Sequence, residues 1–165
     1  MHSLACALVL VLFTPQAIGE VETHFDKTAN FSAFRTYAWS KGHEAFDPAA
    51  HKMITEAIDV EMTGLGFTKA EAGKADVLLT YHSVRSSEVD LKALDKLGPG
   101  QDAASATKIL GRLAVVLSNP TSRATLWSAG TRRRLSDDPV KWKDEVLRAV
   151  QTLFDTYPGR KKGGK

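Results

Sequence analysis

Cysteine is nearly absent from the sequence, and its absence excludes several kinds of chemistry. Among 165 residues only Cys6 is a cysteine, and it lies in an N-terminal segment that we expect to be removed. The chain after that segment has no thiolate nucleophile, no thiolate metal ligand and no means of forming an internal disulfide bond. A metal site would need histidine and carboxylate side chains brought together by folding.

Recognised catalytic motifs are missing as well. The sequence has no H-E-x-x-H zinc motif, no G-x-S-x-G nucleophile turn and no glycine-rich phosphate loop with its lysine. The later histidines show no zinc-binding spacing; they are His24, His43, His51 and His82. We therefore predict a protein that is not an enzyme and that binds no metal or cofactor. An uncharacterised hydrolase is the less favoured alternative.

Charged residues are absent from the first nineteen positions. Residues 4–13 form an apolar run that is too short to span a bilayer as a helix. Ala17 and Gly19 then supply the small residues of a signal-peptidase site. We expect residues 1–19 to be a signal peptide, and the protein to be periplasmic or peripherally associated with the cell envelope. Retention of the segment as an anchor and lipidation at Cys6 are the alternatives.

Excess charge is small, with a net charge of +3. Part of it lies in residues 159–165, which we predict to be a basic disordered tail. An exported protein seldom meets nucleic acid, so we expect an anionic lipid surface or another envelope protein as partner. No membrane span is predicted once the signal peptide is removed.

Aromatic residues are concentrated in residues 30–39, which hold Phe31, Phe34, Tyr37 and Trp39. The two phenylalanines, three residues apart, indicate a single turn, and the residues after them are typical of a strand. Burying such a ring stabilises a fold by roughly 2–3 kcal/mol. We interpret this stretch as a core anchor, and an aromatic ligand platform is the alternative.

Periodicity predicts one α+β domain over residues 20–158. Asp47-Pro48 and Asp138-Pro139 each mark the start of an amphipathic helix. Residues 86–107 show the weakest pattern, and we expect a loop with a short amphipathic helix there, suited to binding. The predicted strands are 21–26, 36–39, 76–84, 108–117 and 124–135. The expected fold is an antiparallel or mixed sheet of four to five strands with two helices on one face, in the order β-β-α-β-β-β-α.

Alternation in the last strand separates a core face from an arginine-rich face. Trp127, Ala129 and Thr131 are predicted to face the core, whereas Arg132 and Arg134 project from the other side. Together with Arg123 across the hairpin, these guanidinium groups are our candidates for binding an anionic surface. The alternative is that they keep an edge strand soluble.

Several segments resemble a known family. The aromatic stretch Asn-Phe-Ser-Ala-Phe-Arg-Thr-Tyr-Ala-Trp carries the likeness, together with residues 21–26, 65–67, 75–82, 111–117, 126–130 and 153–158. In this order they are similar to the domain of unknown function 4136 family, exported bacterial envelope proteins that are often lipoproteins. The resemblance implies an envelope location and a small α+β fold, and it implies no reaction or ligand.

The sequence thus favours a binding or assembly accessory of the cell envelope, acting through its sheet surface or residues 86–107. A carrier of a small apolar or lipid-like ligand is the main alternative. A deep apolar cavity between sheet and helices would indicate the carrier, and histidine and carboxylate groups converging in a cleft would indicate the hydrolase.

Overall fold

The computed structural model describes residues 20–45, 47–136 and 138–160. The predicted signal peptide and residues 161–165 of the predicted tail lie outside this part of the chain. Arg160, also assigned to the tail, pairs with Glu61 at 2.9 Å and with Asp155 at 3.4 Å.

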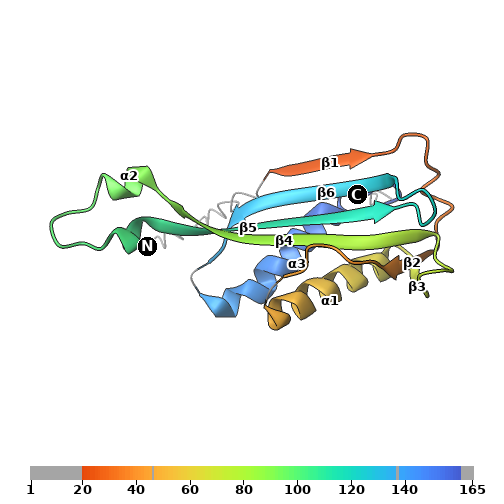
Figure 1. Cartoon of the computed structure of the whole chain (residues 1–165), viewed down its shortest axis with the longest axis horizontal. Helices are drawn as coiled ribbons and strands as arrows, with labels where there is room; N and C mark the ends of the chain where they lie inside the picture. The colour runs from red at the N-terminus through yellow and green to blue at the C-terminus, as the bar shows by residue number, and fades with distance from the viewer. Residues whose placement is uncertain (1–19, 46, 137, 161–165) are drawn as a thin grey trace, which may run out of the picture.

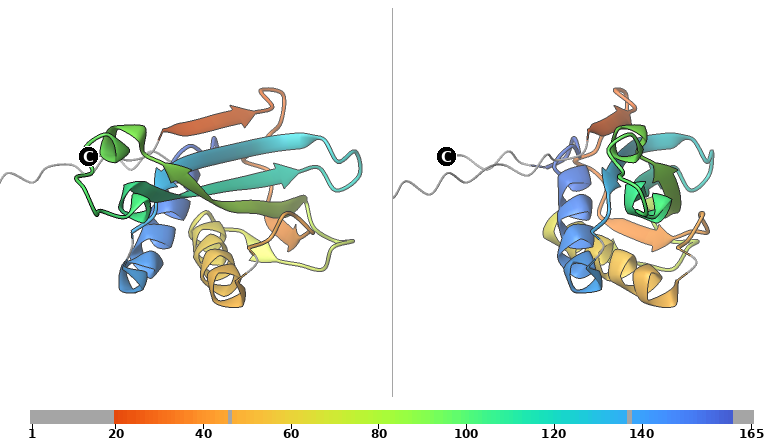
Figure 2. Two further views of the ribbon diagram at one scale, coloured as in Figure 1. Left: turned by 60° about the vertical axis from the view of Figure 1, so that its left-hand side comes forward. Right: turned by 90° about the vertical axis from the view of Figure 1, so that its left-hand side faces the viewer.

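The described elements form one mixed sheet with two long helices on one of its faces (Figures 1 and 2). In chain order they are β1 (Val21–Phe25), β2 (Thr36–Trp39), α1 (Pro48–Gly64), β3 (Thr68–Lys69), β4 (Val77–Val89), α2 (Leu91–Leu94), a 3-10 turn (Ala103–Ala106), β5 (Thr107–Ser118), β6 (Thr125–Arg134), a second 3-10 turn (Pro139–Lys141) and α3 (Trp142–Phe154). The strand order is β1-β6-β5-β4-β2-β3. Neighbours are antiparallel except β4-β2 and β2-β3, which are parallel.

The predicted α+β class and mixed sheet are confirmed, whereas the element count was too low. The sheet has six strands, and α2 joins the two predicted helices among the described residues. The two-residue β3 is too short to produce a periodic pattern, whereas α2 lies within residues 86–107, where the sequence predicted a short amphipathic helix.

Residues 86–107 differ most from the prediction, because they form a projecting hairpin arm rather than a loop (Figure 1). β4 continues to Val89, which pairs with Thr107 at the start of β5, and α2 lies near the tip of the arm. The residues of β4 in the arm are mostly polar, so they gave no apolar alternation that would predict a strand. Backbone pairing holds this part of the strand without an apolar face.

One helix start is confirmed and the other is shifted. The carboxylate of Asp47 accepts hydrogen bonds from the N–H groups of Ala49 and Ala50 at 2.7 and 3.0 Å, as expected for the cap of α1. Asp138 instead accepts a bond from the N–H of Val140 in the 3-10 turn, and α3 begins only at Trp142.

Trp127 lies at the centre of the core, fully buried against the C-terminal end of α3. Its ring centroid is 5.3 Å from that of Phe154 and 5.6 Å from that of Tyr157. Phe31 in turn packs against Tyr157 at 5.5 Å, edge to face. The aromatic stretch 30–39 is therefore part of the core, as predicted.

Asp59 of α1 ties the strand end of that stretch to the helix layer. Its Oδ1 accepts hydrogen bonds from the Tyr37 hydroxyl at 2.6 Å and from Trp39 Nε1 at 2.9 Å. Lys69 of β3 donates to Oδ2 at 3.0 Å. Burial, reinforced by the bond to Asp59, raises the pKa of Tyr37. One carboxylate thus joins β2, α1 and β3.

We expect Asp59→Ala to lower the free energy of unfolding by roughly 1–3 kcal/mol, because the buried Tyr37 hydroxyl loses its partner. Lys69→Met is the control and should cost less than about 1 kcal/mol, since it removes an ion pair and a cation–π contact that both lie near the surface. Urea unfolding of both variants measures the difference. Equal losses of unfolding free energy in the two variants would show that the hydrogen bonds from Tyr37 and Trp39 to Asp59 add nothing to stability.

Asp76 fixes the opposite end of the β2–β4 pair. Its Oδ2 accepts bonds from the backbone N–H groups of Arg35 and Thr36, each at 2.9 Å, and from the Thr36 hydroxyl at 3.0 Å. These bonds, led by the Arg35 N–H, lower the pKa of Asp76 from its usual 3.8. The ionised carboxylate is therefore the form that the fold favours.

Because the folded-state pKa of Asp76 lies below its unfolded value, its contribution to stability is present above about pH 3.8 and lost as the pH falls through the folded-state pKa. We expect the difference in unfolding free energy between the wild type and Asp76→Asn to be largest at neutral pH and to shrink below that point. A difference that stays constant with pH would contradict this role.

Candidate functional site

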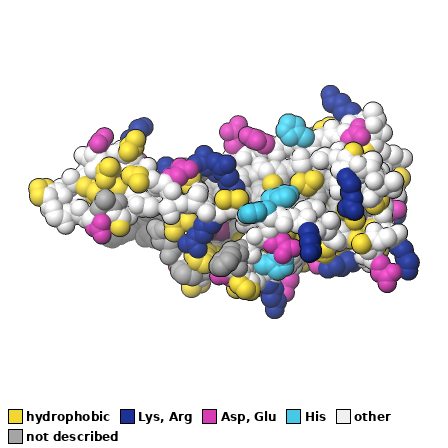
Figure 3. All heavy atoms as spheres, in the orientation of Figure 1, with side chains coloured by type: hydrophobic (Ala, Val, Ile, Leu, Met, Phe, Trp, Pro, Cys, Tyr) yellow, Lys and Arg dark blue, Asp and Glu magenta, His cyan; other side chains and the backbone are white. Residues whose placement is uncertain are grey.

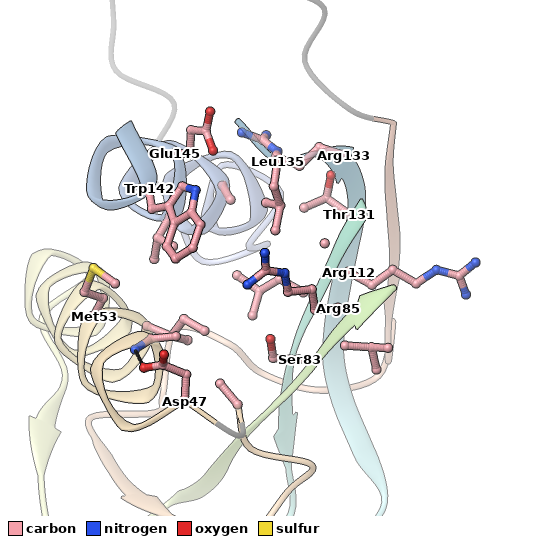
Figure 4. A pocket seen from close by; sticks show the side chains of 18 of the residues that line it. Asp47, Met53, Ser83, Arg85, Arg112, Thr131, Arg133, Leu135, Trp142 and Glu145 are labelled. Carbon is pink, nitrogen blue, oxygen red and sulfur yellow. Dashed lines mark hydrogen bonds between the residues drawn. The ribbon is translucent and has the colours of Figure 1, made fainter. Parts of the chain in front are cut away.

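A pocket of about 440 Å³ opens between α1, α3 and the sheet (Figure 4). Its volume falls in the roughly 300–1,000 Å³ range of ligand pockets. The N-terminal halves of both helices line it, through Ala50 and Met53 of α1 and Trp142 and Val146 of α3. The C-terminal halves instead close on the core. The pocket is thus the part of the helix–sheet interface that the core leaves unfilled.

Two rows of paired residues from β4, β5 and β6 form the pocket floor. Strand register places Ser83, Leu113 and Thr131 in one row and Arg85, Gly111 and Arg133 in the next. Residues two apart on a strand share a face, so both rows face the helices. The floor therefore carries hydroxyl and guanidinium groups beside apolar side chains.

The absence of a side chain at Gly111 leaves room for the side chain of Leu135. A Cβ at position 111 would lie 2.9 Å from the Leu135 side chain, which points into the pocket in Figure 4. Leu135, Met53 and Val146 therefore supply apolar wall around the two floor arginines.

Two buried polar atoms at the floor have no hydrogen-bond partner among the described residues. They are Arg133 Nε and Thr131 Oγ1, and Thr131 as a whole is only 6% exposed. Burial lowers the pKa of Arg133, Glu145 opposes that change and Arg148 adds to it. The guanidinium of Arg85 stacks on Trp142 at 5.1 Å. The floor thus presents donors that the described protein groups leave unsatisfied.

The side of the pocket nearest α1 is held by a tyrosine–histidine contact. The Tyr81 hydroxyl lies 2.6 Å from His51 Nδ1 and accepts a bond from the Ala45 N–H at 3.0 Å. Glu44 lies 3.9 Å from the same nitrogen, and burial raises the pKa of Tyr81. These contacts position the backbone of the pocket wall around Ala45. Within the described ranges, no cluster of three or more histidine and carboxylate residues is arranged to hold a metal ion.

The arginines singled out in the sequence lie outside this pocket, and only two of them are neighbours. Arg132 pairs with Glu88, and Arg134 lies close enough to Asp90 to help lower its pKa, after the larger effects of the Ala93 N–H and Lys108. Figure 3 shows basic and acidic side chains together where the arm meets the sheet. Arg123 lies in the turn before β6, with φ of 61°, at the opposite end of that strand. Binding of an anionic surface by these residues stays a prediction.

The sequence contained a signal for Arg133 that we did not use. The alternation that places Trp127, Ala129 and Thr131 on the core face continues to position 133. An arginine on a core face is unusual, because buried charges are rarely left unpaired. Arg85 gave no such signal, since β4 was predicted to end at residue 84.

Comparison of the sequence with models of protein families identifies the family of this chain. The family described as Domain of unknown function (DUF4136) matches residues 21–159. The chain belongs to the DUF4136 family. No curated protein matches the sequence. Within the described residues, no helix of this DUF4136 protein has the length and apolar character needed to cross a membrane.

Two solved structures share the fold. A PDZ domain protein from Parabacteroides distasonis is 18% identical with a TM-score of 0.58, and the match covers 88% of this chain and 36% of that one. The PelC dodecamer from Paraburkholderia phytofirmans is 12% identical with a TM-score of 0.53, covering 82% of this chain and 95% of that one. This chain therefore spans about a third of the first protein's length. At these identities the likeness concerns the fold alone.

We expect Thr131→Val to raise the free energy of unfolding by about 1 kcal/mol, because it removes a buried hydroxyl that has no partner. Thr36→Val is the matched control. Its hydroxyl both accepts from the Asp76 N–H and donates to the Asp76 carboxylate, so the same change should destabilise the protein. Urea unfolding measures both, and destabilisation by Thr131→Val would show that its hydroxyl is already satisfied.

Proposed function

We propose that this DUF4136 protein is a non-enzymatic, exported cell-envelope protein that holds a small apolar or lipid-like ligand in the pocket between α1, α3 and the sheet. One observation carries the proposal: a pocket of ligand size is walled by aliphatic and aromatic side chains at a helix–sheet interface. Such a cavity is what distinguishes the carrier from the alternatives raised by the sequence.

The packing of the helices supports a site with a fixed shape. Ile58 and Met62 of α1 and Leu153 and Phe154 of α3 are fully buried, and they hold the C-terminal halves of both helices on the sheet. The N-terminal halves of the same helices, which form the pocket walls, are therefore held in place without a ligand. A largely preformed pocket loses less conformational entropy when it binds.

The exported location rests on the apolar segment at residues 4–13 and the small residues before Glu20. Envelope lipids and their breakdown products are the apolar compounds that a protein in that compartment meets. The accessory role predicted from the sequence is thereby narrowed to ligand binding in this pocket.

Filling the pocket tests the proposal. Ala50 lines the pocket in the first turn of α1, so we expect Ala50→Phe to weaken binding of the neutral apolar fluorophore N-phenylnaphthylamine by at least about tenfold. Val60→Phe places the same ring on the same helix at a position that is 66% exposed, and it should leave binding unchanged. Fluorescence titration gives the affinities.

Thermal unfolding of both variants is the control for folding, and each should show a cooperative transition. Equal affinity of Ala50→Phe and the wild type would place the fluorophore elsewhere and contradict the proposal, as would the absence of saturable binding to the wild type.

A further inference from the structure

Arg85 and Arg133, the two arginines of the pocket floor, lie in one cross-strand row. Gly111 lies between them and has no side chain. Arg85 pairs with Gly111 and Gly111 pairs with Arg133, so two strand spacings, about 10 Å, separate the arginine backbones. Figure 4 shows Arg85 reaching into the pocket toward Trp142, while Arg112, on the neighbouring position of β5, points away from it. The row therefore places positive charge at the pocket floor itself.

The charge of Arg133 is not matched by a bonded carboxylate. Glu145 is the acidic residue that acts on it, yet no hydrogen bond or ion pair joins the two among the described residues, and Glu145 Oε2 accepts the Ser136 N–H at 3.2 Å. Asp47 is similarly engaged as the cap of α1. The Arg133 side chain is half-buried, and its Nε is fully buried without a partner. Leaving such a group unpaired is costly, and such groups are concentrated where a ligand completes them.

Unsatisfied atoms alone do not define a site, because Trp127 Nε1 and Tyr157 Oη also lack partners. Those two belong to residues of the packed core that do not line the pocket. Thr131 and Arg133 differ because both line the pocket and lie two residues apart on one face of β6. Their free donors are therefore placed where a ligand can reach them.

We propose that the ligand is an amphiphile with an anionic head group, a carboxylate or a phosphate, that binds at Arg133 and Thr131 with Arg85 nearby, while its chain lies along Met53, Val146 and Leu135. This inference rests on the proposed function and names its ligand class. A guanidinium fork matches the paired oxygens of either head group, and charge-assisted bonds are stronger than neutral ones. The apolar walls would bind the chain.

Calorimetric titration with matched probes tests the inference. Undecanoate, decyl phosphate and decanol share a ten-carbon alkyl chain and differ in head group, while acetate and inorganic phosphate carry the head group alone. We expect at least one of the two anionic amphiphiles to bind about tenfold to hundredfold more tightly than decanol, the range expected for one charge-assisted hydrogen bond. Whichever anionic amphiphile binds more tightly identifies the head group as a carboxylate or a phosphate. Acetate and phosphate should bind far more weakly than the amphiphiles.

Substitutions place the head group. Arg133→Met should reduce the affinity of the anionic amphiphile to that of decanol, and Arg133→Lys should restore part of the advantage. Arg112 also borders the pocket, but its guanidinium points away from it, so Arg112→Met, which removes the same charge, should leave the advantage intact. Thr131→Val, which keeps the size of the side chain, should weaken the anionic probe several-fold without affecting decanol, and it tests the site even if Arg133→Met does not fold.

The titrations distinguish a failure of the head-group inference from a failure of the proposed function. If decanol binds as tightly as both anions, or if the anionic advantage survives Arg133→Met and Thr131→Val, the head-group inference is wrong and the apolar pocket stands. If acetate or phosphate binds as tightly as the amphiphiles, the site is one for small anions. If neither decanol nor the anionic amphiphiles bind, the proposed function itself is wrong.

Discussion

Burial of Trp127 beneath the C-terminal end of α3 is the interaction on which the rest of the structure depends. The indole is fully buried and contacts Phe154 and Tyr157, and Tyr157 carries the contact on to Phe31. Removing a ring of this kind from water stabilises a fold by roughly 2–3 kcal/mol. The aromatic cluster holds one end of the helix layer against the sheet, and Asp59 links α1 to β2 and β3 of the sheet.

The pocket follows from that arrangement. α1 carries small or flexible residues toward its N-terminal end, Ala50 and Met53, whereas the C-terminal halves of both helices carry fully buried ones. The sheet below presents arginine, serine and threonine side chains beside the aliphatic Leu113. Polar groups left unsatisfied there lower the stability of the free protein, and a trade of stability for binding is common at functional sites. The same residues that cost stability are those that would recognise the ligand.

Local patterns in the sequence predicted the elements but not the site. Asp47-Pro48 and the spacing of apolar residues located α1, and alternation assigned Trp127 to the core face. The hairpin arm was missed because its strands are held by backbone pairing, and α3 was started too early because a 3-10 turn uses the same Asp-Pro signal. The pocket depends on where α1 and α3 meet the sheet. These helices begin at Pro48 and Trp142, which are 94 residues apart in the sequence. No local pattern reports such a tertiary relation. Arg133 was the exception, since its place on the core face followed from alternation.

The central claim is that an apolar chain enters the pocket between α1 and α3, and methyl NMR of labelled methionine tests it most directly. Met53 lines the pocket, whereas Met62, about two and a half turns farther along the same helix, is fully buried in the core and does not line it. Titration with decanoate should shift the Met53 methyl signal progressively to saturation and leave that of Met62 nearly unchanged. A Met53 signal that does not move while decanoate binds would contradict the account.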